Sequence, residues 1–173
     1  MRKLNRILAA ALLISAASAP ALAQSTASVS TTGDVRIVQP ISITKNSDLA
    51  FGTVVKPTTG TNDIVINATT GARTRTGAGD AALATSTSGR ATFTVGGEGA
   101  QTFAVTVPAT FDMTSSANTI TVTLAASGAT GTLSGSLGSA GTATFGVGGT
   151  FPITSAQASG NYTGTFTTTV DYN

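Results

Sequence analysis

Apolar and polar residues alternate with a period of two along much of this chain, and this alternation limits the folds open to it more than any other feature. In extended backbone, successive side chains point to opposite faces, so a period of two is typical of a β-strand with one buried face. Thr fills many of the polar positions, and its branched Cβ favours extended backbone. The alternation predicts strands in residues 49–51, 64–66, 91–95, 102–107, 119–124, 143–147 and 151–153.

Turn-forming residues separate these segments. Runs rich in Gly, Pro, Ser and Asp occupy residues 57–60, 77–80, 96–99, 127–131, 138–141 and 148–149. Short strands at this spacing indicate an all-β sandwich or barrel, and one apolar face per strand favours a two-sheet sandwich with a single core. Residues 71–89 show the least pattern, and we expect a long, mobile loop there.

The N-terminus has the pattern of a secretory signal peptide. Arg2, Lys3 and Arg6 precede an apolar run at residues 7–17, and Ala21-Leu22-Ala23 matches a small-x-small cleavage site. The alternative is an uncleaved N-terminal anchor, but the apolar run is short for a membrane span. We therefore predict a signal peptide at 1–23, an N-terminal extension at 24–39 and a β-sandwich domain at 40–173, with export through the periplasm to the cell surface or medium.

Composition excludes several kinds of chemistry. The 173 residues contain no Cys and no His, which removes thiolate or imidazole catalysis, disulfides and Cys/His zinc sites. Three of the nine basic residues lie in the predicted signal peptide, leaving six against seven acidic ones. A nearly neutral chain without a basic stripe argues against a nucleic-acid partner, and no apolar run after the signal peptide is long enough for a spanning helix.

The two ends of the predicted mature chain are both strongly patterned. At the C-terminus, residues 162–173 alternate between a largely apolar even-numbered face and a polar odd-numbered face, which predicts a last strand near the sheet boundary. At the N-terminus, one face of an extended arm is formed by Ala27, Val29, Thr31, Gly33, Val35 and Ile37. Pro40 then interrupts the pattern, because proline cannot donate to a ladder.

An arm with one apolar face cannot bury that face alone. It could fill a groove on a neighbouring copy, where main-chain hydrogen bonds provide affinity and alternate side chains enter pockets. The alternative is that residues 27–37 are the first strand of their own domain. Spacing alone does not separate these two interpretations.

Several stretches resemble bacterial chaperone–usher pilus subunits and, more specifically, the secreted domain-of-unknown-function family 4402, related to spore-coat-protein-U-like pilins. Gly160 is fourteenth from the C-terminus and Tyr172 is penultimate, as in pilus subunits, and Gly33 matches a glycine on the inserted face of their donor arms. The stretches similar to family 4402 are Ile41–Lys45, Leu49–Gly52, Phe145–Ile153 and Gly160–Gly164.

The resemblance implies an immunoglobulin-like, pilin-like sandwich that lacks a final strand and polymerises by donor-strand exchange. Its implied partners are copies of itself or related subunits, a periplasmic chaperone and an outer-membrane usher. It places the contact with chaperone or neighbouring subunit on Gly160, Tyr162, Phe166, Val170 and Tyr172. Many pilins of this type carry a disulfide near the first strand; this chain, without Cys, departs from them.

The sequence motifs that could indicate catalysis or ligand binding are weak. Ser42 and Lys45 fit an S-x-x-K pattern, but on a strand these positions face opposite sides. Residues 77–82 fit a relaxed dinucleotide fingerprint without its βαβ context and are expected to form a loop. Asp63, Asp80 and Asp112 could bind calcium through oxygen ligands, yet nothing in their spacing favours a site. We expect no catalytic residues, cofactor or metal, and no enzyme activity.

The sequence leaves two functions from different classes. The first is a structural subunit of a surface fibre or pilus. The second is a secreted adhesin or carbohydrate-binding β-sandwich module, which would need polar and aromatic groups converging in the loops at one end. The loops of this chain consist mostly of Gly, Ser, Ala and Thr, which favours the structural subunit.

Overall fold

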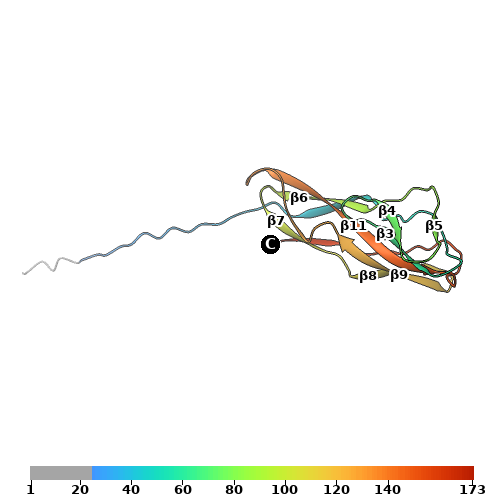
Figure 1. The fold of residues 1–173 in the computed structure, drawn as a ribbon. Coiled ribbons are helices and arrows are strands. Elements are labelled where there is room, and N and C mark those ends of the chain that lie inside the picture. The colour runs from blue at the N-terminus through green and yellow to red at the C-terminus, as the bar shows by residue number, and fades with distance from the viewer. Residues whose placement is uncertain (1–24) are drawn as a thin grey trace, which may run out of the picture. The chain divides into compact units, whose positions relative to one another are not determined.

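The computed structural model describes residues 25–173, and the predicted signal peptide lies outside them. The described residues contain twelve strands and no helix. They therefore include no helix that is long and apolar enough to cross a membrane. Figure 1 shows the strands of the compact unit Arg36–Asn173. The predicted all-β sandwich is confirmed. The strands are β1 Ser42–Ser47, β2 Val54–Val55, β3 Thr61–Ile66, β4 Arg73–Thr76, β5 Ala82–Leu83, β6 Ala91–Glu98, β7 Thr102–Thr106, β8 Thr110–Ser115, β9 Asn118–Ala126, β10 Thr130–Thr132, β11 Ala140–Thr154 and β12 Thr169–Tyr172.

The large sheet is built around β11. It has seven strands in the order β1-β6-β11-β3-β4, and β9 pairs with β11 and β8 in the same sheet. The first part of β11 pairs with β6 from Ala140 to Val147, and its last part pairs with β3 from Gly149 to Thr154. All of these pairings are antiparallel.

A three-stranded sheet of order β10-β7-β12 and a two-stranded sheet of β2 and β5 complete the fold. The core contains the residues that the alternation placed on inward faces, such as Ile64 and Ile66 of β3 and Ile120, Val122 and Leu124 of β9. Phe93 and Phe145 stack across β6 and β11 with ring centroids 5.1 Å apart. Phe51 and Phe151 meet edge to face at 4.9 Å. Aromatic pairs in these geometries add to the free energy gained by burial alone.

Of the runs that we predicted as turns, 148–149 and the first part of 96–99 lie inside strands, whereas Gly99 does lie in a turn. Gly96 and Gly97 belong to β6, and Gly148 and Gly149 continue β11. The glycines are needed for packing, because a Cβ on Gly148 would overlap the carbonyl oxygen of Ile66. At Gly148 another backbone approaches closely, and at Gly97 and Gly149 the neighbouring atoms belong to side chains.

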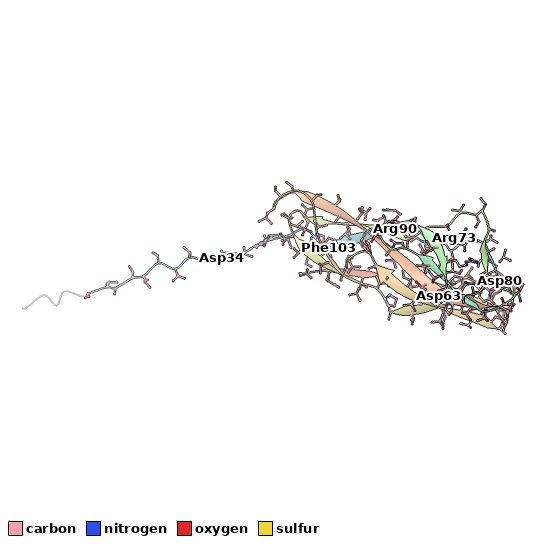
Figure 2. All side chains as sticks on the ribbon, in the orientation of Figure 1. Asp34, Asp63, Arg73, Asp80, Arg90 and Phe103 are labelled. Atoms are coloured by element: carbon pink, nitrogen blue, oxygen red, sulfur yellow. The ribbon has the colours of Figure 1, made fainter. Side chains whose placement is uncertain are left out.

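The predicted loop at 71–89 is also wrong, since it contains β4 and β5. Polar contacts fix this region where hydrophobic periodicity is absent. The Arg73 guanidinium (Figure 2) donates to the carbonyl oxygens of Phe51 at 2.7 Å and Ala84 at 2.6 Å. The fully buried Asn62 donates to the carbonyls of Thr76 and Gly79 at 3.0 Å. Residues 77–81, which carried the dinucleotide-like motif, do form a loop as expected.

Asp80 closes the neighbouring turn. Its carboxylate accepts hydrogen bonds from the Thr58 hydroxyl at 2.5 Å and from the backbone N–H groups of Thr58 and Thr59 at 2.7 and 3.0 Å. The Thr58 hydroxyl and the Thr59 N–H, in that order, lower the pKa of Asp80 from 3.8 to about 2. Hydrogen bonds to a carboxylate favour its charged form, so Asp80 remains an acceptor down to low pH.

Candidate functional site

The last patterned segment, residues 162–172, has one inward and one outward face. Its even-numbered side chains are buried or half-buried, apart from Gly164, and its odd-numbered side chains are exposed. The predicted alternation is therefore confirmed. The strand itself is shorter than predicted, since only Thr169–Tyr172 forms β12 and Thr163 makes an isolated bridge to Thr114 of β8.

Residues 164–168 lie between that bridge and β12, and their backbone is unpaired. Within residues 25–173, no backbone–backbone hydrogen bond involves any residue of this segment. The missing ladder explains why the predicted strand is interrupted here. Extended backbone with free N–H and C=O groups is a template on which another strand can form.

β12 continues this free edge, because β7 flanks it on one side only. The backbone N–H of Asn173 donates to the carbonyl of Thr102 at 3.1 Å. In an antiparallel pair the bonded residues alternate, so the odd-numbered residues of β12 direct their backbone groups to β7. The even-numbered residues, Val170 and Tyr172, therefore direct theirs to the open side.

The end of β12 is hydrogen-bonded to the backbone that precedes β1 and to the end of β6. The Tyr172 hydroxyl donates to the carbonyl of Gln39 at 2.8 Å and accepts from the backbone N–H of Glu98 at 2.7 Å. The Gln39 N–H donates to a carboxylate oxygen of the buried Glu98 at 3.2 Å. A Cβ on Gly97 would overlap the Tyr172 hydroxyl, so glycine makes room for this contact.

Away from these hydrogen bonds, a groove opens between β1 and the C-terminal segment. A cavity of about 290 Å³ is lined on one side by Lys45, Asp48 and Leu49 and on the other by residues 162–166. Its apolar lining includes Phe93 of β6 and Phe111 and Met113 of β8. The Phe111 and Phe166 rings lie 5.1 Å apart, and both are half-buried.

A second cavity of about 620 Å³ extends the groove, since Leu49, Met113 and Tyr162 line both cavities. Apolar side chains again contribute to its lining, in particular Phe51, Ile120, Phe151 and Ile153. The groove therefore reaches core residues of the sandwich, although polar residues such as Lys56 and Gln157 also line it.

One buried polar atom of the C-terminal segment has no hydrogen-bond partner within the described residues. The Thr168 hydroxyl is buried, and it has no hydrogen-bond partner within residues 25–173. A buried hydroxyl without a hydrogen-bond partner destabilises the folded state by about 1–3 kcal/mol, so such atoms are rare in native structures. It lies in the same segment whose backbone is unpaired.

The domain that contains this groove matches a known protein family. Residues 41–172 match the family described as Domain of unknown function (DUF4402). The chain belongs to the DUF4402 family. None of the curated proteins or solved structures compared with the chain matches it. The DUF4402 domain includes both walls of the groove, from the residues before β1 to the end of β12.

The predicted donor arm precedes the DUF4402 domain. Residues 25–40 form no strand, and the exposed fractions of Val29, Val35 and Ile37 are 92%, 84% and 84%. The expected donor residues Ala27, Val29, Thr31, Gly33, Val35 and Ile37 are all exposed. Their role in another copy remains a prediction.

In the structure, the residues of the S-x-x-K pattern and the three candidate calcium ligands do not come together in a site. Ser42 of β1 bonds to the carbonyl of Gly96, whereas Lys45 forms an exposed ion pair with Asp48 at 2.5 Å. Asp63 lies in β3, Asp112 in β8 and Asp80 beside the turn at 58–59. No group of three acidic, His or Cys side chains suited to a metal ion occurs in residues 25–173 of this DUF4402 chain.

β8 was not among the predicted strands, although its sequence contains the signal. Phe111 and Met113 alternate with Thr110, Asp112 and Thr114, but two apolar positions form a short pattern. Thr168 was not predicted as a site residue either, because a Thr on an otherwise apolar face gives no indication of whether its hydroxyl finds a partner. Of the predicted contact residues, Gly160, Tyr162 and Phe166 line the groove. Val170 is buried in the core, and Tyr172 is hydrogen-bonded to Gln39 and Glu98.

Proposed function

We propose that this DUF4402 protein is a structural subunit of a bacterial surface fibre or pilus, assembled by donation of a strand from one copy to the next. The observation that carries the proposal is the unpaired backbone of residues 164–168 beside a groove that reaches core residues. An added strand would satisfy the backbone groups, and its inward side chains would fill the groove.

The arm at residues 27–37 supplies the matching strand. Its inward face is apolar except for Thr31, its outward face is polar, and its side chains are exposed. The free edge is on the domain and the arm is N-terminal to it, so each copy has one donor and one acceptor. Such a heterologous contact does not close on itself, and it generates an open filament.

Delivery of the subunit by a periplasmic chaperone and an outer-membrane usher is part of the proposal. An acceptor with an unfilled groove needs a partner before assembly, since exposed strand edges and apolar grooves aggregate. The signal-peptide pattern supports export to the periplasm.

Removing the arm tests this function. We expect the full chain to form fibres on the cell surface, seen by electron microscopy and as ladders in unheated gels. The chain lacking residues 24–38 retains the groove but has no donor, so it should form no fibres. A control with the arm present and Ser28 and Ser30 replaced by Thr, on the polar face, should assemble normally.

Fibres formed by the chain lacking residues 24–38 would overturn donation by this arm. Addition of the truncated chain to the full chain provides a second measurement. The truncated chain can accept but not donate, so it should cap growing fibres and shorten them in proportion to its amount. Unchanged fibre length would contradict the proposed function.

A further inference from the structure

If the proposed function holds, two threonine hydroxyl groups indicate the register in which the arm of one copy pairs with the C-terminal segment of the next. On the acceptor, Thr168 has a buried hydroxyl without a partner. On the arm, Thr31 is the one polar side chain among Ala27, Val29, Gly33, Val35 and Ile37. A Thr hydroxyl both donates and accepts, and Thr pairs across neighbouring strands form hydrogen bonds.

We infer that the arm of one copy pairs antiparallel with the C-terminal segment of the next, with Thr31 opposite Thr168. Paired residue numbers then add to 199, as 31 and 168 do. The patterned segments 27–37 and 162–172 are equal in length, and this register aligns them from end to end.

Side-chain sizes fit this register. Gly33 falls opposite Phe166 and Ala27 opposite Tyr172, so the small residues of the arm face the large residues of the acceptor. Val35 falls opposite Gly164 and Ile37 opposite Tyr162, in the part of the groove where the two cavities lie. Val35 therefore meets no opposing side chain, and Ile37 lies at the end of the groove that both cavities share.

Other registers fit less well. A shift of two residues places the Thr168 hydroxyl against Val29 or Gly33, neither of which has a side-chain hydrogen-bonding group. One shift sets Gly33 opposite Gly164, so that two residues without side chains face each other, and the other sets Val35 opposite Phe166. A parallel strand with Thr31 opposite Thr168 places Val29 against Phe166 and Val35 against Tyr172. These are the two aromatic residues that the antiparallel register pairs with the smaller Gly33 and Ala27.

Backbone geometry agrees with the register and suggests how to test it. The even-numbered residues of the acceptor direct their backbone groups to the open side, so the inward pairs are the hydrogen-bonded ones. The outward pairs Ser30–Thr169 and Thr32–Thr167 are then non-hydrogen-bonded, with Cα atoms about 4.5 Å apart. That spacing suits a disulfide, and all four side chains are exposed.

The test uses single-cysteine full-length chains, because the native chain has no Cys. Full chains carrying Ser30→Cys or Thr32→Cys are mixed, under mild oxidation, with differently tagged full chains carrying Thr167→Cys or Thr169→Cys. One cysteine per chain excludes intramolecular disulfides. Each cysteine occurs in one matched pair, 30 with 169 or 32 with 167, and in one shifted pair, 30 with 167 or 32 with 169.

We expect both matched pairs to give mixed-tag disulfide dimers at least about tenfold faster than the shifted pairs, since a shift of two residues moves the Cα atoms beyond disulfide reach. Fibres with preferential disulfides in a shifted pair, or with none in any pair, would overturn the register and leave strand donation intact. Absence of both fibres and disulfides would overturn the proposed function as well.

Discussion

At the scale of single residues, buried polar groups differ in whether they find partners. Asn62 is fully buried, and its side-chain amide makes three hydrogen bonds to backbone groups of residues 76–81. Glu98 is buried and accepts from the N–H groups of Gln39 and Gly138. Thr168, in contrast, has no partner for its hydroxyl within residues 25–173. Asn62 and Glu98 therefore make their hydrogen bonds within the domain, whereas the Thr168 hydroxyl makes none there.

Replacing the Thr168 hydroxyl with a methyl group should stabilise the unassembled chain. Thr168→Val keeps the shape and removes a buried polar atom without a partner, so we expect the free energy of unfolding to rise by about 1 kcal/mol. Urea denaturation of unassembled full chain measures this. The exposed neighbour gives a control, Thr167→Val, which should change stability by less than about 0.5 kcal/mol. A loss of stability in Thr168→Val would mean that the hydroxyl already has a partner.

Asp80 gives a pH dependence whose sign follows from its lowered pKa. Its folded-state pKa of about 2 lies below the ordinary 3.8. The carboxylate therefore contributes stability that is fully present above about pH 4 and is lost as the pH falls towards 2. We expect Asp80→Asn to lower the urea midpoint at pH 7 and to flatten its fall between pH 4 and 2. Asp34→Asn, in the exposed arm, serves as the control. Parallel pH profiles for Asp80→Asn and the native chain would contradict this.

At the scale of elements, the two-residue alternation predicted strands correctly where a segment has both a buried face and a neighbouring strand. The alternation in β3, β6 and β9 matches the observed burial, because each of these strands is paired along its length. The same kind of pattern predicted a strand over 162–173, but only Thr169–Tyr172 forms a strand, and Thr163 makes no more than an isolated bridge. A side-chain pattern indicates which face of a segment is inward, but it does not show whether a neighbouring strand forms hydrogen bonds with its backbone.

The arm gives a prediction at this scale, because its central glycine is unrestrained. A Cβ on Gly33 would meet nothing within 4 Å, and Gly33 has no positive φ. Gly33→Leu should therefore leave the stability of the unassembled chain unchanged. In the assembled state a leucine would oppose Phe166 and clash, so fibre formation should slow at least about tenfold, a cost typical of overpacking.

Fibre growth followed by light scattering measures this effect, with urea denaturation as the check on stability. Asp34→Leu, one position along on the outward face, is the matched control and should slow growth much less. Equal growth rates for Gly33→Leu and the native chain would mean that Gly33 is not on an inserted face.

At the scale of the whole domain, topology creates the groove. Tyr172 at the end of β12 is hydrogen-bonded to Gln39, which precedes β1, and to Glu98 of β6. Farther along, a cavity separates Lys45 of β1 from residues 162–166. No strand of the chain within residues 25–173 occupies the space between them. In the proposed assembly, the arm of another copy occupies this space.

The sequence by itself determined the all-β class, the inward faces of the main strands and the two patterned ends, because these follow from local alternation. Only the tertiary structure decided that Gly96–Gly97 and Gly148–Gly149 lie within strands, and that Arg73 and Asn62 order residues 71–89. It alone located the groove, its lining by β8 and the partnerless Thr168 hydroxyl. The physical reason is that pairing, close backbone approach and hydrogen-bond satisfaction depend on residues far apart in the chain, which a local pattern does not record.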